Sequence, residues 1–206
     1  GFLAEDPSFV EKLEAAGIEF LGPSAETMRR LGDKITSKLI AEAARVPVSP
    51  WSGGPVQRLE LPDLAKRIGF PVMLKATAGG GGRGIRMLRE GDDLNAAFDS
   101  AQAEAANAFG DGTLFVEKTI SGARHVEVQM AADRHGTVLA LGLRDCSVQR
   151  RHQKVVEEGP PPGLSPALMR QLREASIRLL REASYRGVAT CEYLVISEGG
   201  EESFYF

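Results

Sequence analysis

The residues best suited to binding a phosphate chain lie in a glycine-rich run between Lys75 and Gly84. Glycines fill positions 79–82, and Lys75 and Arg83 flank them. Backbone without side chains can approach phosphate oxygens closely and point successive N–H groups at them. The run is not a Walker A loop, because no Gly-Lys-Ser/Thr follows, and it does not fit the dinucleotide fingerprint, because a strand is predicted after it. It therefore indicates a triphosphate-binding flap, or else a flexible surface turn.

A second stretch, from Arg144 to Glu158, places many cations and carboxylates in a short segment. It follows an apolar run, and Val155-Val156 returns to apolar character directly after Lys154. Cations held at the edge of a sheet can neutralise phosphate together with another anion. A run of charges is also typical of a solvated loop. On these residues alone both interpretations stay open.

Glu192 is a carboxylate inside an otherwise apolar strand pattern, between Cys191 and Tyr193. Burying a carboxylate is costly unless it is paired or binds a metal ion. A magnesium site normally has a second carboxylate on the neighbouring strand, and the segment expected to supply it lies just past Phe206. The alternative is an ordinary strand residue that faces water.

Weaker signals lie elsewhere in the chain. Glu117-Lys118 ends a predicted strand, where backbone groups can meet the edge of an adenine ring, although charged strand ends are common. His125 and Glu127 share one face of an alternating strand, but a lone histidine is more often structural than a ligand contact. Lys34 near the start of a predicted helix is, by itself, an ordinary surface lysine.

The elements that must position these residues form an α+β set. Apolar periodicity and capping residues predict helices at 7–16, 24–31, 33–43, 64–68, 92–108 and from 165 onward. Alternation and short apolar runs predict strands at 18–21, 71–74, 85–88, 113–117, 124–130, 137–143, 187–196 and 203–206. The glycine run then joins two strands as a hairpin-like flap. A small sheet-and-helix lobe near 48–118 is expected, followed by a larger antiparallel-sheet lobe.

Composition places the chain among ordinary globular proteins, with 43% apolar residues, 26% charged residues and a net charge of −3 over 206 residues. No basic excess could neutralise a nucleic-acid backbone, and no apolar run approaches the roughly 20 residues that span a bilayer. Cys146 and Cys191 match no metal-ligand or disulfide spacing, which indicates a reducing compartment. The chain lacks an initiator methionine and ends on a strand-like Phe204-Tyr205-Phe206, so we interpret it as part of a longer chain.

In combination these segments resemble biotin carboxylase, the ATP-grasp component of acyl-CoA carboxylases and of pyruvate carboxylase. The resemblance spans essentially the whole chain. The glycine run alone is shared with carbamoyl phosphate synthetases, whereas the run from Gln149 to Lys154 with its flanks is much more specific to the biotin enzymes. The matching segments are, in chain order, 1–5, 20–23, 32–34, 70–84, 117–118, 124–127, 144–158 and 185–192.

The resemblance implies an ATP-grasp fold, built from an antiparallel-sheet lobe and a small mobile α+β lobe. Residues 1–31 are expected to be the end of an N-terminal α/β domain. Residues 32–206 are expected to be the ATP-grasp domain, truncated at its C-terminal end, with a lid lobe at about 48–118. The family's second metal-binding glutamate, and an asparagine and an arginine beyond it, would follow Phe206.

The resemblance also implies roles for individual positions. ATP phosphates are expected to contact Lys34 and Lys75, with Gly81, Gly82 and Gly84 closing over them. The adenine ring is expected at Glu117 and at the backbone of Lys118 and Ile120, and further nucleotide contacts at His125, Gln149, His152 and Leu194. Lys154 is the expected catalytic residue, near bicarbonate and the γ-phosphate, and Glu192 is the expected magnesium ligand.

The activity implied by the resemblance is the ATP- and bicarbonate-dependent carboxylation of biotin. This is the first half-reaction of biotin-dependent carboxylases, such as the acyl-CoA carboxylases of fatty acid metabolism. Bicarbonate attacks the γ-phosphate of ATP, the carboxyphosphate that forms gives CO₂ and phosphate, and biotin captures the CO₂. Positioning and charge neutralisation supply most of the acceleration in such phosphoryl transfers. The implied cofactors are ATP, Mg²⁺ or Mn²⁺, and carrier-bound biotin.

The implied partners are a biotin carboxyl carrier protein or domain and a carboxyltransferase subunit or domain, with bicarbonate as a substrate. A homo-oligomer or a multi-subunit complex is expected, in the cytoplasm or, in a eukaryote, in the mitochondrial matrix; neither nucleic acid nor a membrane is an expected partner. The alternatives are another ATP-grasp ligase, such as a carbamoyl phosphate synthetase half, and a nucleotide-binding module without turnover. The 206-residue chain by itself is expected to bind ATP without turnover.

Overall fold

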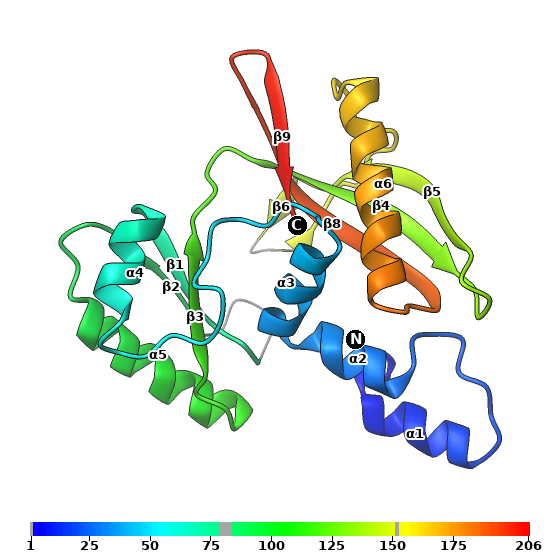
Figure 1. The fold of residues 1–206 in the computed structure, drawn as a ribbon, viewed down its shortest axis with the longest axis horizontal. Coiled ribbons are helices and arrows are strands. Elements are labelled where there is room, and N and C mark those ends of the chain that lie inside the picture. The colour runs from blue at the N-terminus through cyan, green and yellow to red at the C-terminus, as the bar shows by residue number, and fades with distance from the viewer. Residues whose placement is uncertain (1, 79–83, 151–152) are drawn as a thin grey trace. The chain divides into compact units, whose positions relative to one another are not determined.

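The computed structural model describes residues 2–78, 84–150 and 153–206, and it divides into two compact units (Figure 1). Unit 1 comprises Gly1–Gly32, Thr36–Pro47 and Gly122–Phe206. Unit 2 comprises Asp33–Ile35 and Val48–Ser121. Each unit has its own sheet and its own helices, so each is described by itself.

Unit 2 contains a three-stranded antiparallel sheet in the order β2-β1-β3. The strands are β1 (Val72–Ala76), β2 (Ile85–Leu88) and β3 (Leu114–Lys118), and the helices are α4 (Leu61–Ile68) and α5 (Leu94–Phe109). Alternate residues such as Leu74 and Val116 pack with both helices in one buried core. The opposite face of the sheet carries Lys75, Phe115 and Glu117, because side chains alternate along a strand.

A smaller apolar cluster covers part of that opposite face. Ile35 and Trp51 pack against Phe115, and the rings of Trp51 and Phe115 meet edge to face with their centroids 6.1 Å apart. The backbone beside Trp51 also bonds to β3, since the Ser52 N–H donates to the Val116 carbonyl at 2.8 Å. Glu117 therefore lies in a strand that is paired on both sides, by β1 and by the segment at Trp51.

Unit 1 is built on a four-stranded antiparallel sheet in the order β5-β4-β8-β9, with the long helix α6 packed across one face (Figure 1). The strands are β4 (Arg124–Ala132), β5 (Val138–Asp145), β8 (Gly187–Glu198) and β9 (Glu201–Tyr205), and α6 is Pro166–Glu182. Two-residue strands β6 (Gln149–Arg150) and β7 (Gln153–Lys154) form a separate pair. The remaining helices are η1 (Phe2–Glu5), α1 (Pro7–Ala15), α2 (Ala25–Gly32) and α3 (Lys34–Ala43), the last of which begins in unit 2.

The sheet of unit 1 has one apolar face and one charged face, as the alternation of the sequence predicts. The side chains buried on the apolar face are Val126, Val128 and Met130 of β4 and Cys191, Tyr193 and Val195 of β8. The charged face carries His125, Glu127, Glu192 and Leu194. The backbone register pairs Glu127 with Glu192 and His125 with Leu194. Two of the predicted site strands are thus direct neighbours.

Replacing Tyr193 with phenylalanine is expected to lower the free energy of unfolding by about 1 kcal/mol, the usual net contribution of a buried hydrogen bond. The Tyr193 hydroxyl lies 2.8 Å from Ser176 Oγ within the packed face, and Ser176 keeps its bond to the Leu172 carbonyl. Urea denaturation measures the effect. Tyr185→Phe is the matched control, because its hydroxyl donates to the Val188 carbonyl at 3.1 Å where water can replace it. Equal losses in the two variants would contradict the prediction.

One predicted element is wrong. The segment 18–21, expected as a short strand, has no strand hydrogen bonds. The Ile18 N–H instead donates to the Leu13 carbonyl at 2.9 Å and closes the end of α1, where Gly17 has φ 71°. Leu21 is 88% exposed, so no core face holds this segment extended. Within the described ranges, the helices are too short or too polar to cross a bilayer.

Candidate nucleotide and bicarbonate sites

In unit 2, Lys34 and Lys75 are close enough to influence each other. Burial and the neighbouring Lys75 charge lower the pKa of Lys34. Lys34 Nζ lies 3.4 Å from the Thr77 carbonyl oxygen, at the point where β1 leads into the glycine run. Lys75 forms an ion pair with Glu117. Two ammonium groups held together in this way repel each other, so an anion between them is stabilised.

Glu117 is 9% exposed, and its carboxylate is held from two directions. Lys75 pairs with one of its oxygens, and the Ser49 hydroxyl donates to the other at 3.2 Å. The residue that the sequence predicts to meet adenine therefore also fixes the lysine that the sequence predicts to meet phosphate. The predicted adenine contact and the predicted phosphate contact are thus the two members of one ion pair, Glu117 and Lys75.

Lys118 and Ile120 were expected to offer backbone groups to adenine. The Lys118 N–H donates to the Pro50 carbonyl at 2.7 Å, and its Nζ donates to the carbonyls of Gly69 and Phe70 at 2.7 and 2.9 Å. A contact between Lys118 and adenine must therefore use the carbonyl oxygen or compete with these bonds. Ile120 follows the end of β3, in the segment that leaves the sheet.

Among the predicted flap residues, Gly84 is described, whereas Gly81 and Gly82 lie outside the described residues. Gly84 has φ 67°, and a Cβ atom there would come 2.9 Å from the Ala76 Cβ. Its N–H donates to Glu104 Oε1 at 3.2 Å. Glycine is thus required at this position both by its backbone conformation and by the close approach of β1.

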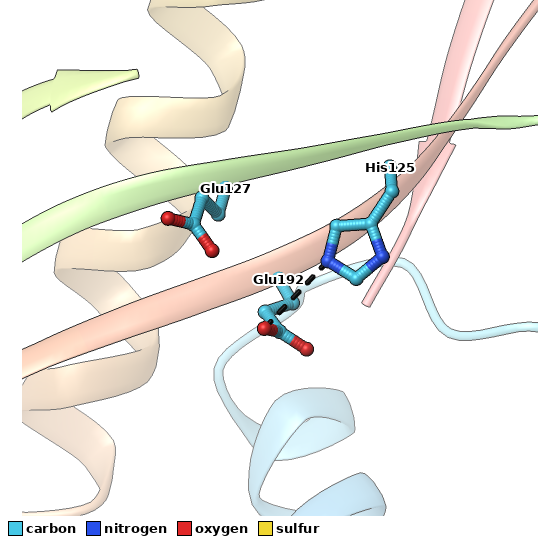
Figure 2. Close-up of side chains that lie close together, drawn as sticks. All are labelled: His125, Glu127 and Glu192. Carbon is cyan, nitrogen blue, oxygen red and sulfur yellow. Dashed lines mark ion pairs between the residues drawn. The ribbon is translucent and has the colours of Figure 1, made fainter. Parts of the chain in front are cut away.

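In unit 1, Lys154 lies between the two glutamates that face each other across β4 and β8. Its ammonium donates to Glu127 and, at 2.7 Å, to Glu192 Oε1. Figure 2 shows both carboxylates on the same side of the strands, with the His125 ring beside Glu192. His125 Nε2 is 3.6 Å from Glu192 Oε1. The structure therefore brings Lys154, Glu192 and His125 together, as residues of one site should be.

Gln149 and Leu194 join the same group of residues. Gln149 Nε2 lies 3.2 Å from His125 Nδ1 and donates to the Cys146 carbonyl at 2.9 Å. Leu194 is the cross-strand partner of His125 and is 37% exposed. The predicted nucleotide contact His152 lies outside the described residues.

The charges of this cluster are strongly coupled. The neighbouring His125 ring, with Nε2 3.6 Å from Oε1, and then the contact with Lys154 lower the pKa of Glu192 to about 2 despite burial. Burial opposes the charge on Lys154, but its hydrogen bonds to Glu127 and Glu192 outweigh that effect and raise its pKa. Burial likewise opposes the charge on Glu127, yet bonds from Lys154 and Arg144 lower its pKa. All three groups are therefore ionised at neutral pH.

Among the described residues, two groups of side chains have the donor atoms for a metal ion, and the chemistry of the donors separates them. Ligand atoms of His125, Glu127 and Glu192 lie within 4.8 Å of one another. The Glu127 oxygens are engaged by Arg144 and Lys154, which leaves Glu192 as the carboxylate that fits Mg²⁺. The second group contains Cys146, whose thiol pKa burial raises to about 11, so it stays protonated and is a poor ligand.

Sequence reasoning assigned no role to Glu127 or Arg144. Both belong to the same charged face: Arg144 of β5 is the cross-strand partner of Glu127, and its Nε donates to Glu127 at 2.6 Å. The available signal was the alternation of β4, which places Glu127 two residues from His125. The partner on β5 depends on strand register, which alternation alone does not specify.

These features define an ATP-grasp type of domain, with a lysine pair at a glycine run in one unit and a lysine–carboxylate cluster on an antiparallel sheet in the other. The model of the family described as carbamoyl-phosphate synthase L chain, ATP binding domain, matches residues 33–206. The chain therefore belongs to this family of ATP-binding domains.

Over its whole length the chain is similar to biotin carboxylases. It is 44% identical over 207 residues to biotin carboxylase of Halalkalibacterium halodurans, covering 100% of this chain and 45% of that protein. The biotin carboxylase–β-γ-ATP complex of Campylobacter jejuni superposes with a TM-score of 0.92 at 44% identity, covering 99% of this chain and 46% of that one.

A second solved structure is the biotin carboxylase domain dimer of 2-oxoglutarate carboxylase from Hydrogenobacter thermophilus, in complex with MgADP, ADP and bicarbonate. It has a TM-score of 0.90 at 41% identity, covering 99% of this chain and 45% of that one. The chain thus spans less than half the length of these relatives. The predicted α+β ATP-grasp fold and the resemblance to biotin carboxylase are both confirmed.

Proposed function

We propose that this chain is the ATP-binding part of a ligase that carboxylates biotin, with bicarbonate as the source of the carboxyl group and cleavage of ATP as the driving reaction. The observation that carries the proposal is the cluster of Lys154, Glu192, His125 and Gln149 on one sheet face. These residues lie in or pack against the segment that resembles the biotin enzymes specifically. The carbamoyl phosphate synthetase alternative is not favoured, because the similar full-length relatives are biotin carboxylases.

In this proposal, Lys34 and Lys75 bind the phosphates, and Lys154 neutralises charge on bicarbonate and the γ-phosphate. Bicarbonate oxygen forms a bond to the γ-phosphorus as the bond to ADP breaks, and the C–O bond of carboxyphosphate then breaks to give CO₂ and phosphate. Mg²⁺ held at Glu192 would supply charge neutralisation on the phosphates when bound.

Residues 1–31 and 32–206 are proposed as separate domains, with residues 48–118 as the lid lobe.

Biotin is proposed to arrive on a carrier protein or domain, and a carboxyltransferase to pass the carboxyl group to its final acceptor. We place this activity in the cytoplasm, or in the mitochondrial matrix if the source is a eukaryote. The relatives are parts of biotin-dependent carboxylases, which supports carrier and carboxyltransferase partners of this kind.

The test is a phosphate-release assay on the full-length protein that contains this sequence. MgATP cleavage is expected to require bicarbonate and to rise when free biotin is added. Bicarbonate-dependent cleavage that biotin does not raise would contradict the proposal and would favour a ligase of the carbamoyl phosphate synthetase kind. Tight MgATP binding without any cleavage would instead favour a nucleotide-binding module.

Nucleotide affinity is expected to fall with rising pH earlier than an ordinary lysine site would. Lys34 must be protonated to bind phosphate, and burial and the Lys75 charge lower its pKa, so its charge is lost at a lower pH than that of a free lysine. Lys34→Arg is the matched variant, because arginine stays charged throughout this range. Calorimetric titration with MgADP across pH measures the effect. The same pH dependence in both proteins would contradict the assignment.

A further inference from the structure

Glu127 is the most deeply buried charged side chain described in unit 1, at 1% exposed, and it is held by cations from two segments. Arg144 of β5 donates from Nε to Oε1 at 2.6 Å, and Lys154 of β7 donates to Oε2. The two oxygens are therefore used separately, one by each cation. A carboxylate so enclosed has little freedom to turn toward a ligand.

The Arg144 side of this arrangement is itself fixed. Arg144 Nη2 donates to Gln129 Oε1 at 2.9 Å, and Gln129 Nε2 donates to the Ala189 carbonyl of β8 at 2.9 Å. The chain of bonds thus crosses β5, β4 and β8 and ends on backbone. Glu127 is anchored by this chain of contacts independently of Lys154.

Glu192, the other carboxylate that contacts Lys154, is more exposed than Glu127 and has different neighbours. The Glu192 side chain is 49% exposed, it is shared with His125, and it is the carboxylate that fits a metal ion. A Glu192 oxygen that binds a divalent cation cannot at the same time hold the Lys154 ammonium equally well, because the two cations repel each other. The Lys154 ammonium would then be held by Glu127, which Arg144 keeps in place.

We propose that Glu127 is a positioning residue: it keeps the Lys154 ammonium in place when Glu192 turns to a metal-bound nucleotide, and so prevents Lys154 from competing for Glu192. This inference rests on the proposed function for the role of Lys154 in turnover, but its core concerns only Lys154, Glu127 and Glu192. In the absence of Glu127, the ammonium has Glu192 as its sole described carboxylate partner.

The experiment is a double-mutant cycle read by Mn²⁺ affinity in the presence of saturating ADP, measured by electron paramagnetic resonance on the full-length protein. Glu127→Gln is expected to weaken Mn²⁺ binding roughly tenfold, because Lys154 then pairs with Glu192 alone; coupling of this size is ordinary for residues in contact. Lys154→Met added to Glu127→Gln is expected to restore the affinity. Weak binding that Lys154→Met does not restore would overturn the proposal in favour of a purely structural role.

The matched control is Glu157→Gln, since Glu157 also lies beside Arg144, at 3.6 Å from Nε, but 47% exposed and away from Lys154 in the described contacts. It is expected to leave Mn²⁺ affinity unchanged. If Glu127→Gln does not fold, Glu127→Asp keeps the charge with a shorter reach and is expected to weaken Mn²⁺ binding less, again with recovery on Lys154→Met. An unchanged affinity in a folded Glu127 variant would overturn the proposal.

A turnover readout separates this inference from the proposed function. In Glu127→Gln the KM for bicarbonate is expected to rise at least tenfold, because Lys154 is no longer held in place. The affinity for ATP in the absence of both metal ion and bicarbonate is expected to change little. A wild-type protein without biotin-stimulated ATP cleavage would contradict the proposed function while leaving the Mn²⁺ cycle intact. Failure of the cycle in an active enzyme would contradict the positioning role alone.

Discussion

Replacing Lys154 with methionine is expected to lower biotin-dependent phosphate release about 10³-fold, the loss typical of removing one preorganised electrostatic group from an active site. The ammonium lies between two ionised carboxylates on the charged face of the sheet, and its raised pKa keeps it charged. Methionine preserves the length and much of the volume of the side chain but not its charge. Steady-state kinetics with saturating MgATP and bicarbonate measure kcat.

Nucleotide affinity separates this effect from a loss of folding. Lys154→Met is expected to bind MgADP about as well as the wild type, because the predicted phosphate contacts Lys34 and Lys75 belong to unit 2. The matched control is Lys12→Met, at an exposed lysine of α1, which is expected to retain full activity. A kcat within a few-fold of the wild type would show that Lys154 is an ordinary ion-pair residue.

Replacing Lys75 with methionine is expected to weaken MgATP binding about 10²-fold, since a charge-assisted hydrogen bond contributes about 1.5–3 kcal/mol. The change also removes the ion pair between Lys75 and Glu117. Breaking the pair is expected to lower the free energy of unfolding by about 2 kcal/mol, less than the ~3–5 kcal/mol of a fully buried pair, because the Lys75 side chain is 26% exposed. Calorimetry and urea denaturation measure the two effects separately.

A second variant distinguishes the two consequences. Glu117→Gln in the Lys75→Met background removes the carboxylate charge that had paired with Lys75, so stability is expected to recover, while nucleotide affinity is expected to stay low. Ser49 can still donate to the amide oxygen that replaces the carboxylate. Recovery of affinity together with stability would mean that Lys75 acts only through the fold, and the predicted phosphate contact would be wrong.

Local patterns were sufficient to predict most of the fold. The alternation at 124–130 correctly predicted the charged face of β4, and Ser165 accepts a hydrogen bond as the N-cap of α6. The helix expected from residue 92 begins at Leu94, after the N-cap Asp93. Ile18–Leu21 failed because an apolar segment becomes a strand only when another strand is available to pair with it. The same limit explains why Arg144 was missed, since its bond to Glu127 depends on the register between β4 and β5.

The sequence identified several residues of the candidate site, but it did not predict which side chains contact one another there. The sequence pointed to Glu192 as a carboxylate buried in an apolar strand, whereas its side chain is 49% exposed, with Lys154 and His125 as its neighbours. For Lys118, the sequence predicted a contact with adenine but not the bonds seen in the structure. Its backbone N–H and its Nζ both donate to carbonyl oxygens of residues that lie far from it in the sequence. The predicted roles of Gly81, Gly82 and His152 stay predictions, since these residues lie outside the described ranges.

The most direct test of the proposed reaction asks whether an oxygen atom of bicarbonate is transferred to the phosphate released from ATP. Phosphate released from MgATP by the full-length protein, with biotin and ¹⁸O-labelled bicarbonate in unlabelled water, is analysed by mass spectrometry. If bicarbonate attacks the γ-phosphorus, each phosphate released in the biotin-dependent reaction carries one ¹⁸O. Phosphate that carries no label, because water attacked instead, would contradict the assignment of this chain to the bicarbonate-dependent carboxylation of biotin.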